Sequence, residues 1–174
     1  GVQFHFDQNV EKINTENDKV ESLIINGTEH FFDAVIASSD YQHTETLLDE
    51  SQRNYKESYW ESRTFAPSCL IFYLGIKEVI PNLKHHTLFF ENDLDDHIDD
   101  IYTDKKWPRK PLFYVCCPSK TDPNVAPENH ENLFLLMPLA TGIDDNNFQR
   151  EKYFHEMIER IEKHTGTIDL LQKI

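Results

Sequence analysis

The sequence predicts an α+β fold in which a mainly antiparallel sheet is covered by helices. Three compact apolar runs have the length of buried strands, and they cover residues 69–74, 112–116 and 133–137. After them, apolar residues recur every three or four positions, as on one face of a helix. Because turns and helical segments separate the runs, we expect the three strands to join in one sheet.

The first forty residues read as a series of short strands. Apolar residues alternate with polar ones at the start of the chain, which is the pattern of a strand. Asn26-Gly27 predicts a type I′ hairpin turn, because both central positions of that turn need positive φ. The last strand ends at the small residues Ser38-Ser39. The expected strands cover residues 2–6, 10–13, 20–25 and 31–36.

Capping residues and apolar spacing predict three helices. Asp40 can cap a short helix over residues 41–48. A second helix follows the spacing of Leu94, His97, Ile98 and Ile101. The longest begins near Asn146, where Gln149 stands at capping-box spacing. Its expected buried face consists of Phe154, Met157, Ile158 and Ile161.

The acidic composition restricts the partners. The formal net charge of -14 at pH 7 disfavours binding to nucleic acid, where clusters of Lys and Arg supply the attraction to phosphates. No apolar run approaches the ~20 residues that span a bilayer. We therefore expect no nucleic acid partner, a cytoplasmic location, and lipid contact that is apolar and local.

No metal site is predicted. The pair His85-His86 suggests a metal site. However, adjacent side chains in an extended chain diverge, and no nearby Cys or His completes a zinc-like spacing. The acidic run 93–100 lacks the Gly that a calcium loop needs at its sixth position. Three cysteines, Cys69, Cys116 and Cys117, are expected to be reduced and buried, with the adjacent pair pointing to opposite faces of a strand.

The order of these segments resembles a known family. Gly1-Val2 through Val10, Asn26-Gly27, residues 34–36 and Ser38-Ser39-Asp40 stand as in the C-terminal part of the FAD domain of flavin amine oxidases and carotenoid desaturases. Later segments narrow the resemblance to bacterial-type phytoene desaturases. They are Pro67-Ser68, residues 72–75, 85–90 and 99–102, Pro118, Thr121-Asp122-Pro123, Ala126-Pro127 and residues 133–138. The resemblance covers nearly the whole chain.

The resemblance implies how the chain divides. The family normally carries a Gly-x-Gly-x-x-Gly turn against the FAD pyrophosphate and a second glycine-rich segment near its C-terminus, and this sequence contains neither. We interpret the chain as an internal fragment of a longer enzyme. Residues 1–48 then form a strand-rich remnant of the FAD-binding domain, and residues 49–174 form the substrate-binding region. We expect FAD in the full-length parent and no retention of FAD by the fragment.

The resemblance also implies a reaction. The parent is expected to be an FAD-dependent oxidoreductase of carotenoid biosynthesis that removes hydrogens from a carotenoid precursor, with FAD as hydride acceptor and the isolated fragment inactive. It would contact the membrane only peripherally. Two alternatives stay open: a related carotenoid isomerase or polyene saturase, and a non-catalytic lipid-binding or interaction module. The residues do not assign a catalytic acid or base.

Three residues are expected to bind the cofactor. The resemblance places Val10 at the adenine end of FAD, where it would act through its backbone amide and carbonyl. The alternative is that Val10 is a core residue of its strand. Ser38 and Ser39 occupy the turn that the family places near the dinucleotide, although serines there also serve as turn formers or as caps for the following helix.

An uncharged polyene substrate requires an apolar tunnel. The residues expected in its wall are Phe72, Tyr73, Phe89, Phe90 and Tyr114. The alternative is that most of them belong to the hydrophobic core, and the sequence does not choose which strand face lines the tunnel. Because soluble monomers rarely expose large apolar patches, we also expect a homo-oligomer.

Overall fold

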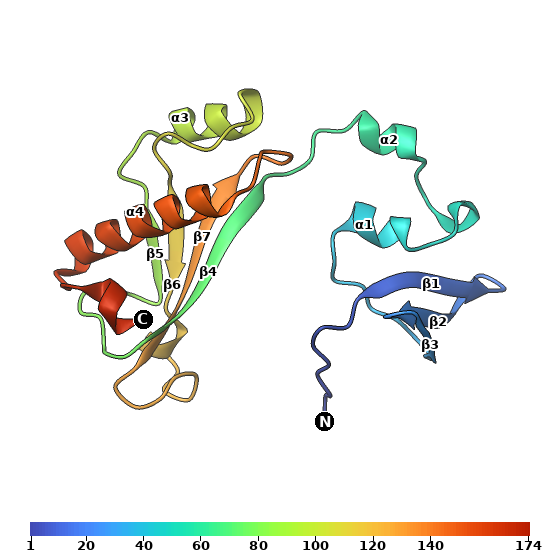
Figure 1. Ribbon diagram of the computed structural model, residues 1–174, viewed down its shortest axis with the longest axis horizontal. Coiled ribbons are helices and arrows are strands. Elements are labelled where there is room, and N and C mark those ends of the chain that lie inside the picture. The colour runs from blue at the N-terminus through green and yellow to red at the C-terminus, as the bar shows by residue number, and fades with distance from the viewer. The chain divides into compact units, whose positions relative to one another are not determined.

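The computed structural model describes residues 1–174 and divides them into two compact units, Gly1–Thr64 and Phe65–Ile174. Each unit contains one antiparallel sheet accompanied by helices (Figure 1). The predicted α+β class is therefore confirmed. The division expected after residue 48 separates a flavin-binding part from a substrate-binding part, and it stays a prediction.

The first unit contains a three-stranded sheet in the order β1-β2-β3. Its strands are β1 (Val10–Glu16), β2 (Lys19–Ile25) and β3 (Thr28–Phe31), followed by α1 (Tyr41–Thr46), a 3-10 turn (Glu50–Gln52) and α2 (Glu57–Glu61). Asn26 and Gly27 have φ values of 48° and 76°, as the predicted hairpin turn requires. Asp40 caps α1 by accepting a hydrogen bond from the backbone N–H of His43, which confirms the predicted start of this helix.

Two strands predicted for this unit are not formed as expected. Residues 2–6 lie outside the sheet, and Phe4 and Phe6 are exposed. The strand predicted over residues 31–36 ends at Phe31, and Ile36 is exposed. Residues 2–6 have no neighbouring strand to pair their N–H and C=O groups, and the pairing of β3 with β2 ends after Phe32, whose N–H donates to the carbonyl of Glu21.

The second unit contains a four-stranded sheet in the order β4-β7-β6-β5, with every pair antiparallel. Its strands are β4 (Ser68–Ile76), β5 (His86–Phe89), β6 (Phe113–Cys116) and β7 (Glu131–Leu139). The three predicted apolar runs form β4, β6 and β7, and β5 completes the sheet at one edge. Two 3-10 turns cover Pro118–Lys120 and Leu170–Lys173.

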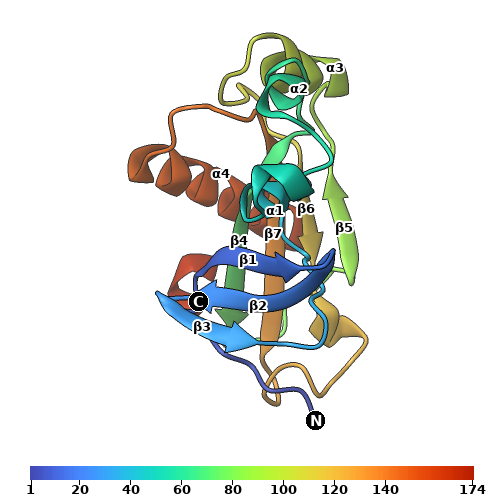
Figure 2. The ribbon, with the colours of Figure 1, turned by 90° about the vertical axis from the view of Figure 1, so that its right-hand side faces the viewer.

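Two helical segments pack on this sheet. The helix α4 (Asn147–Thr165) crosses one face (Figure 1). The helix α3 (Leu94–Ile98) continues as a π-helical turn (Asp99–Thr103) and lies at one end of β5 and β6 in both views (Figure 2). None of the helices combines the length and the apolar composition that a membrane-spanning helix requires.

The core of the second unit lies between α4 and the sheet. Met157, Ile158 and Ile161 of α4 are fully buried, as predicted, whereas Phe154 is half-buried against Phe72 with ring centroids 4.9 Å apart. They face alternate residues of β7, which are Leu133, Leu135, Met137 and Leu139. Each buried side chain of this size contributes about 1.5–3 kcal/mol, so α4 is held mainly by this face.

The three cysteines are free thiols in different environments. Cys117 is buried in the core, and burial raises its pKa, whereas Cys116 is half-buried on the other side of the strand, so the predicted divergence of the pair is confirmed. The expectation that all three are buried is wrong for Cys69, which is exposed. It lies on β4, an edge strand, on the face that α4 does not cover.

The start of α4 gives the first testable prediction. The Asn146 side chain accepts a hydrogen bond of 3.0 Å from the backbone N–H of Gln149. We expect Asn146→Ala to lower the free energy of unfolding of the second unit by about 1 kcal/mol, because one helical N–H loses its partner. Urea denaturation measures this loss. The control is Asn147→Ala, at the exposed neighbouring position, and equal effects of the two variants would contradict the cap.

Candidate functional site

The sheet of the second unit has apolar side chains on both faces. Along β7, buried residues that face α4 alternate with half-buried ones that point the other way. The strand register places Leu136 between Ile71 of β4 and Tyr114 of β6. We call the side away from α4 the open face. It consists of Ile71, Tyr73, Leu88, Tyr114, Phe134, Leu136 and Pro138.

The segment α3 and its π-helical turn close one end of the open face. Between them lies a pocket of about 330 Å³. The helical side contributes Leu94, Ile98, Ile101 and Tyr102, and the sheet side contributes Leu88, Phe90, Tyr114, Leu136 and Pro138. Apart from His97, the lining side chains are apolar or aromatic. Such a lining suits a ligand that has no charged or strongly hydrogen-bonding groups.

A larger hollow of about 520 Å³ lies beside β5 and α4, and its lining is different. Arg160, Lys163 and Glu91 contribute charged groups to it. Arg160 pairs with Glu91 at 2.6 Å, and this hydrogen bond lowers the pKa of Glu91. Because an apolar ligand would have to desolvate these charges, we place the candidate site in the smaller pocket.

His97 fixes α3 to the sheet. Its Nδ1 accepts a hydrogen bond of 2.9 Å from the backbone N–H of Leu112, and its Nε2 lies 3.2 Å from the carbonyl oxygen of Pro138. Both contacts are satisfied by the neutral ring with its proton on Nε2. Burial lowers the pKa of His97, which favours this neutral form. The imidazole thus bridges β6 and β7 just beyond their last paired residues, Tyr114 and Leu136.

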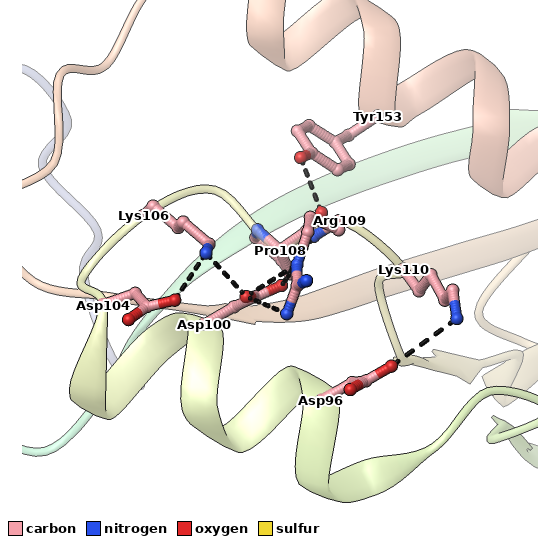
Figure 3. A network of polar contacts seen from close by, with 8 residues as sticks. All are labelled: Asp96, Asp100, Asp104, Lys106, Pro108, Arg109, Lys110 and Tyr153. Carbon is pink, nitrogen blue, oxygen red and sulfur yellow. Dashed lines mark hydrogen bonds and ion pairs between the residues drawn. The ribbon is translucent and has the colours of Figure 1, made fainter.

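Asp100 holds the chain that follows the π-helical turn (Figure 3). Its carboxylate is buried and accepts hydrogen bonds from the backbone N–H and the Nε–H of Arg109, at 2.8 and 3.0 Å, and it pairs with Lys106 at 3.2 Å. Burial acts to raise the pKa of Asp100, but the bonds from Arg109 and Lys106 outweigh it and lower the pKa to about 2. Tyr153 of α4 donates to the carbonyl of Pro108 at 2.7 Å and ties the same loop to the core.

The predicted tunnel residues lie on two different faces of the sheet. Tyr73, Phe90 and Tyr114 are on the side away from α4, and the last two line the pocket. Phe72 packs on Phe154 of α4. Phe89 is buried and stacks on the core residue Phe113, with ring centroids 4.5 Å apart. A role in substrate contact stays a prediction for all five.

Sequence reasoning did not select the helical half of the pocket. Ile98, Ile101 and Tyr102 form that half together with Leu94. The helical spacing of the apolar residues signalled a face that would be covered. It did not indicate that this face would meet the sheet across a cavity rather than fill the core.

The residues predicted to bind the cofactor are in the first unit. Val10 is half-buried at the first position of β1, beside an irregularity in the pairing with β2. β1 is an edge strand, and on its outer side Ile13 N–H donates to the carbonyl of Leu47 at 2.8 Å. Ser38 and Ser39 are exposed in the loop before α1, where Ser39 Oγ lies 2.9 Å from Thr44 Oγ1.

The chain matches one protein family and is similar to curated proteins of known name. The family described as flavin containing amine oxidoreductase matches residues 1–166. The chain is 38% identical to a carotenoid 3,4-desaturase of Haloarcula japonica, over 100% of this chain and 35% of that protein. It is 32% identical to a zeta-carotene-forming phytoene desaturase of Myxococcus xanthus, over 91% of this chain and 32% of that protein.

A solved structure of an oxidoreductase from Methanosarcina mazei is also similar, with a TM-score of 0.43 and 21% identity over 91% of this chain and 33% of that one. The chain spans about a third of the length of the curated relatives it matches.

The neutral state of His97 predicts a pH dependence of stability. The unfolded chain takes up a proton with a pKa near 6.5, and the buried ring resists the same proton. The contribution of His97 to the free energy of unfolding is therefore fully present above that pH, and it is lost as the pH falls toward the pKa of the folded state. We expect the urea midpoint of the second unit to fall between about pH 7 and pH 5.

The variant His97→Gln supplies the comparison, because the amide can serve both backbone partners and does not titrate. We expect a flatter pH profile for this variant. A profile that matches the wild type would assign the loss to other groups.

The buried carboxylate of Asp100 gives a further prediction. We expect Asp100→Ala to destabilise the second unit by about 2 kcal/mol, because the Arg109 N–H loses its acceptor at a buried site, while the two cationic side chains are exposed and remain hydrated. Chemical denaturation measures the loss. The control is Asp104→Ala, which removes an exposed partner of Lys106 and should cost less than about 1 kcal/mol. Similar losses in the two variants would show that burial of Asp100 is unimportant.

Proposed function

The chain belongs to the flavin containing amine oxidoreductase family, and we propose that it forms the substrate-binding region of an FAD-dependent carotenoid desaturase, together with a strip of the flavin-binding domain. The observation that carries this proposal is the apolar pocket between α3 and the open face of the sheet. The carotenoid desaturases among its relatives support the substrate class. The proposed reaction removes hydrogens across a carbon-carbon bond of a carotenoid precursor.

A carotenoid precursor is a long hydrocarbon without charged groups, so its binding depends on apolar contact. A pocket of about 330 Å³ would surround one section of such a chain. Ile71, Tyr73 and Phe134 continue the open face beyond the pocket and can support the rest of the molecule. The task of these residues is to orient the substrate and to exclude water from it.

The first unit contains residues that could contact the adenine end and the dinucleotide part of FAD. β1 is an edge strand, and apart from the Ile13 N–H, which bonds the carbonyl of Leu47, its outer edge can offer the backbone N–H and C=O groups that the edge of an adenine ring requires. We propose that Val10 contributes to this contact and that Ser38 and Ser39 lie near the dinucleotide. When bound, FAD supplies the hydride acceptor. We assign no acid or base to this chain, and the expectation that the chain alone does not retain FAD stays a prediction.

The proposal includes a peripheral contact with the membrane, from which an apolar substrate would enter. Leu94, Ile98 and Tyr102 line the pocket and are also partly exposed, at 48%, 40% and 46%. Such side chains can enter the lipid interface locally without a basic surface. Self-association through the open face also stays a prediction.

Binding of an apolar probe tests this assignment. A fluorescent apolar dye is titrated into the full chain, and a carotenoid in detergent micelles is then used to displace it. We expect Phe90→Ser to weaken dye binding about tenfold, because most of an aromatic contact worth roughly 1.5 kcal/mol or more is lost. Phe90 is 51% exposed and lines the pocket.

The matched control is Phe148→Ser, which removes the same ring at a 74% exposed position outside the pocket. This variant should bind the dye as the wild type does. Equal weakening in both variants, or no displacement by the carotenoid, would place substrate binding elsewhere.

A further inference from the structure

Two histidines and a cysteine meet at the end of the open face that is remote from α3. His86 of β5 and Cys116 of β6 are directly paired across the two antiparallel strands. The rings of His85 and His86 have centroids 4.2 Å apart. One ligand atom from each of these three residues lies within 4.8 Å of the other two. The expectation that the two histidines diverge is therefore wrong, because His85 precedes β5 and does not follow its alternation.

The sequence offered no third ligand near His85-His86, and the fold supplies one. Cys116 follows His86 by thirty positions in the sequence, and the pairing of β5 with β6 places it opposite His86. Its side chain is half-buried, and it forms no disulfide. The backbone beside it is fixed, because Cys117 N–H donates to the carbonyl of His85 at 2.8 Å.

Both imidazoles are held through one nitrogen. Nδ1 of His85 lies 2.6 Å from Thr121 Oγ1, and Nδ1 of His86 lies 2.6 Å from the Tyr114 hydroxyl. When each Nδ1 donates its proton to the neighbouring oxygen, each Nε2 keeps a free lone pair. Metal-binding histidines commonly have this arrangement, in which an oxygen fixes the ring and its tautomer.

We propose that His85, His86 and Cys116 bind a zinc-type divalent cation. Two imidazoles and one thiolate form a ligand set that zinc prefers and that magnesium and calcium do not. Bond lengths near 2.0–2.3 Å require side-chain movements of about 1 Å from the present positions. On binding, the Cys116 S–H bond breaks, a sulfur–metal bond forms, and the proton passes to solvent.

The site lies apart from the core between α4 and the sheet, so the ion adds stability to an already folded unit. It also reaches the proposed substrate region. Tyr114 lines the apolar pocket and bonds His86, so an ion on His86 fixes the position of the Tyr114 ring. The site is thus a means of ordering one wall of the pocket.

Titration of the full chain with Co²⁺ tests the site, because cobalt bound to a thiolate shows a sulfur-to-metal charge-transfer band. We expect one Co²⁺ per chain with this band, displaced by one equivalent of Zn²⁺. Cys116→Ser should abolish the band and weaken binding at least tenfold. The control Cys69→Ser, which removes an exposed thiol of β4, should retain both the band and the affinity.

A matched histidine pair completes the test. His86→Ala should weaken Co²⁺ binding at least tenfold, and His130→Ala, at an exposed position in another loop, should leave it unchanged. Binding without a thiolate band in the wild type, or a band that survives in Cys116→Ser, would overturn the proposal.

A measurement on the wild-type chain covers the case in which a variant fails to fold. Zn²⁺ should slow alkylation of Cys116 at least tenfold and leave the rate at Cys69 unchanged, as read by mass spectrometry of the modified peptides. Equal rates at Cys116 with and without Zn²⁺ would overturn the site.

Discussion

The central strand β7 has apolar side chains on both of its faces, and the second unit is arranged around this property. Leu135 and Met137 face α4 and are fully buried, whereas Phe134 and Leu136 face the other way and stay half-buried. A strand that separates a packed core from a second apolar surface needs cover on both sides. α4 covers one side, where Leu70, Phe72 and Leu74 of β4 stay partly exposed. On the other side, α3 covers one end and leaves a cavity.

That cavity depends on two polar anchors at buried positions. His97 holds α3 against the ends of β6 and β7, and Asp100 holds the loop that returns to β6. In each case the polar group satisfies backbone atoms that no strand or helix pairs. The anchors differ in charge, since His97 is held neutral and Asp100 is held ionised. The pocket wall therefore depends on two polar groups, of which His97 also lines the pocket and Asp100 lies outside it.

The two ends of the open face have different chemistry. One end is enclosed by aliphatic and aromatic side chains from α3 and the sheet. The other end brings His85, His86 and Cys116 together beside Thr121. Tyr114 belongs to both, because its ring lines the pocket and its hydroxyl reaches His86. The proposed substrate wall and the proposed cation site thus share one side chain of β6.

The sequence by itself determined the elements that local chemistry controls. Caps such as Asp40 and Asn146, the turn at Asn26-Gly27 and the apolar runs of the sheet all act over a few residues, so their signals can be read along the chain. The order of segments likewise indicated the family. The strand pattern misled at residues 2–6, which have no partner strand, at residues 32–36, where the pairing with β2 ends, and at His85-His86, where His85 precedes β5.

Only the tertiary structure decided which apolar face forms the pocket and which forms the core. Phe89 and Phe90 are neighbours with the same ring, yet one is buried and the other is 51% exposed beside the cavity. Strand pairing likewise decided that Cys116 meets His86. Burial and ligand geometry depend on residues that are distant in sequence, and the side-chain pattern of a single segment contains no record of its partner.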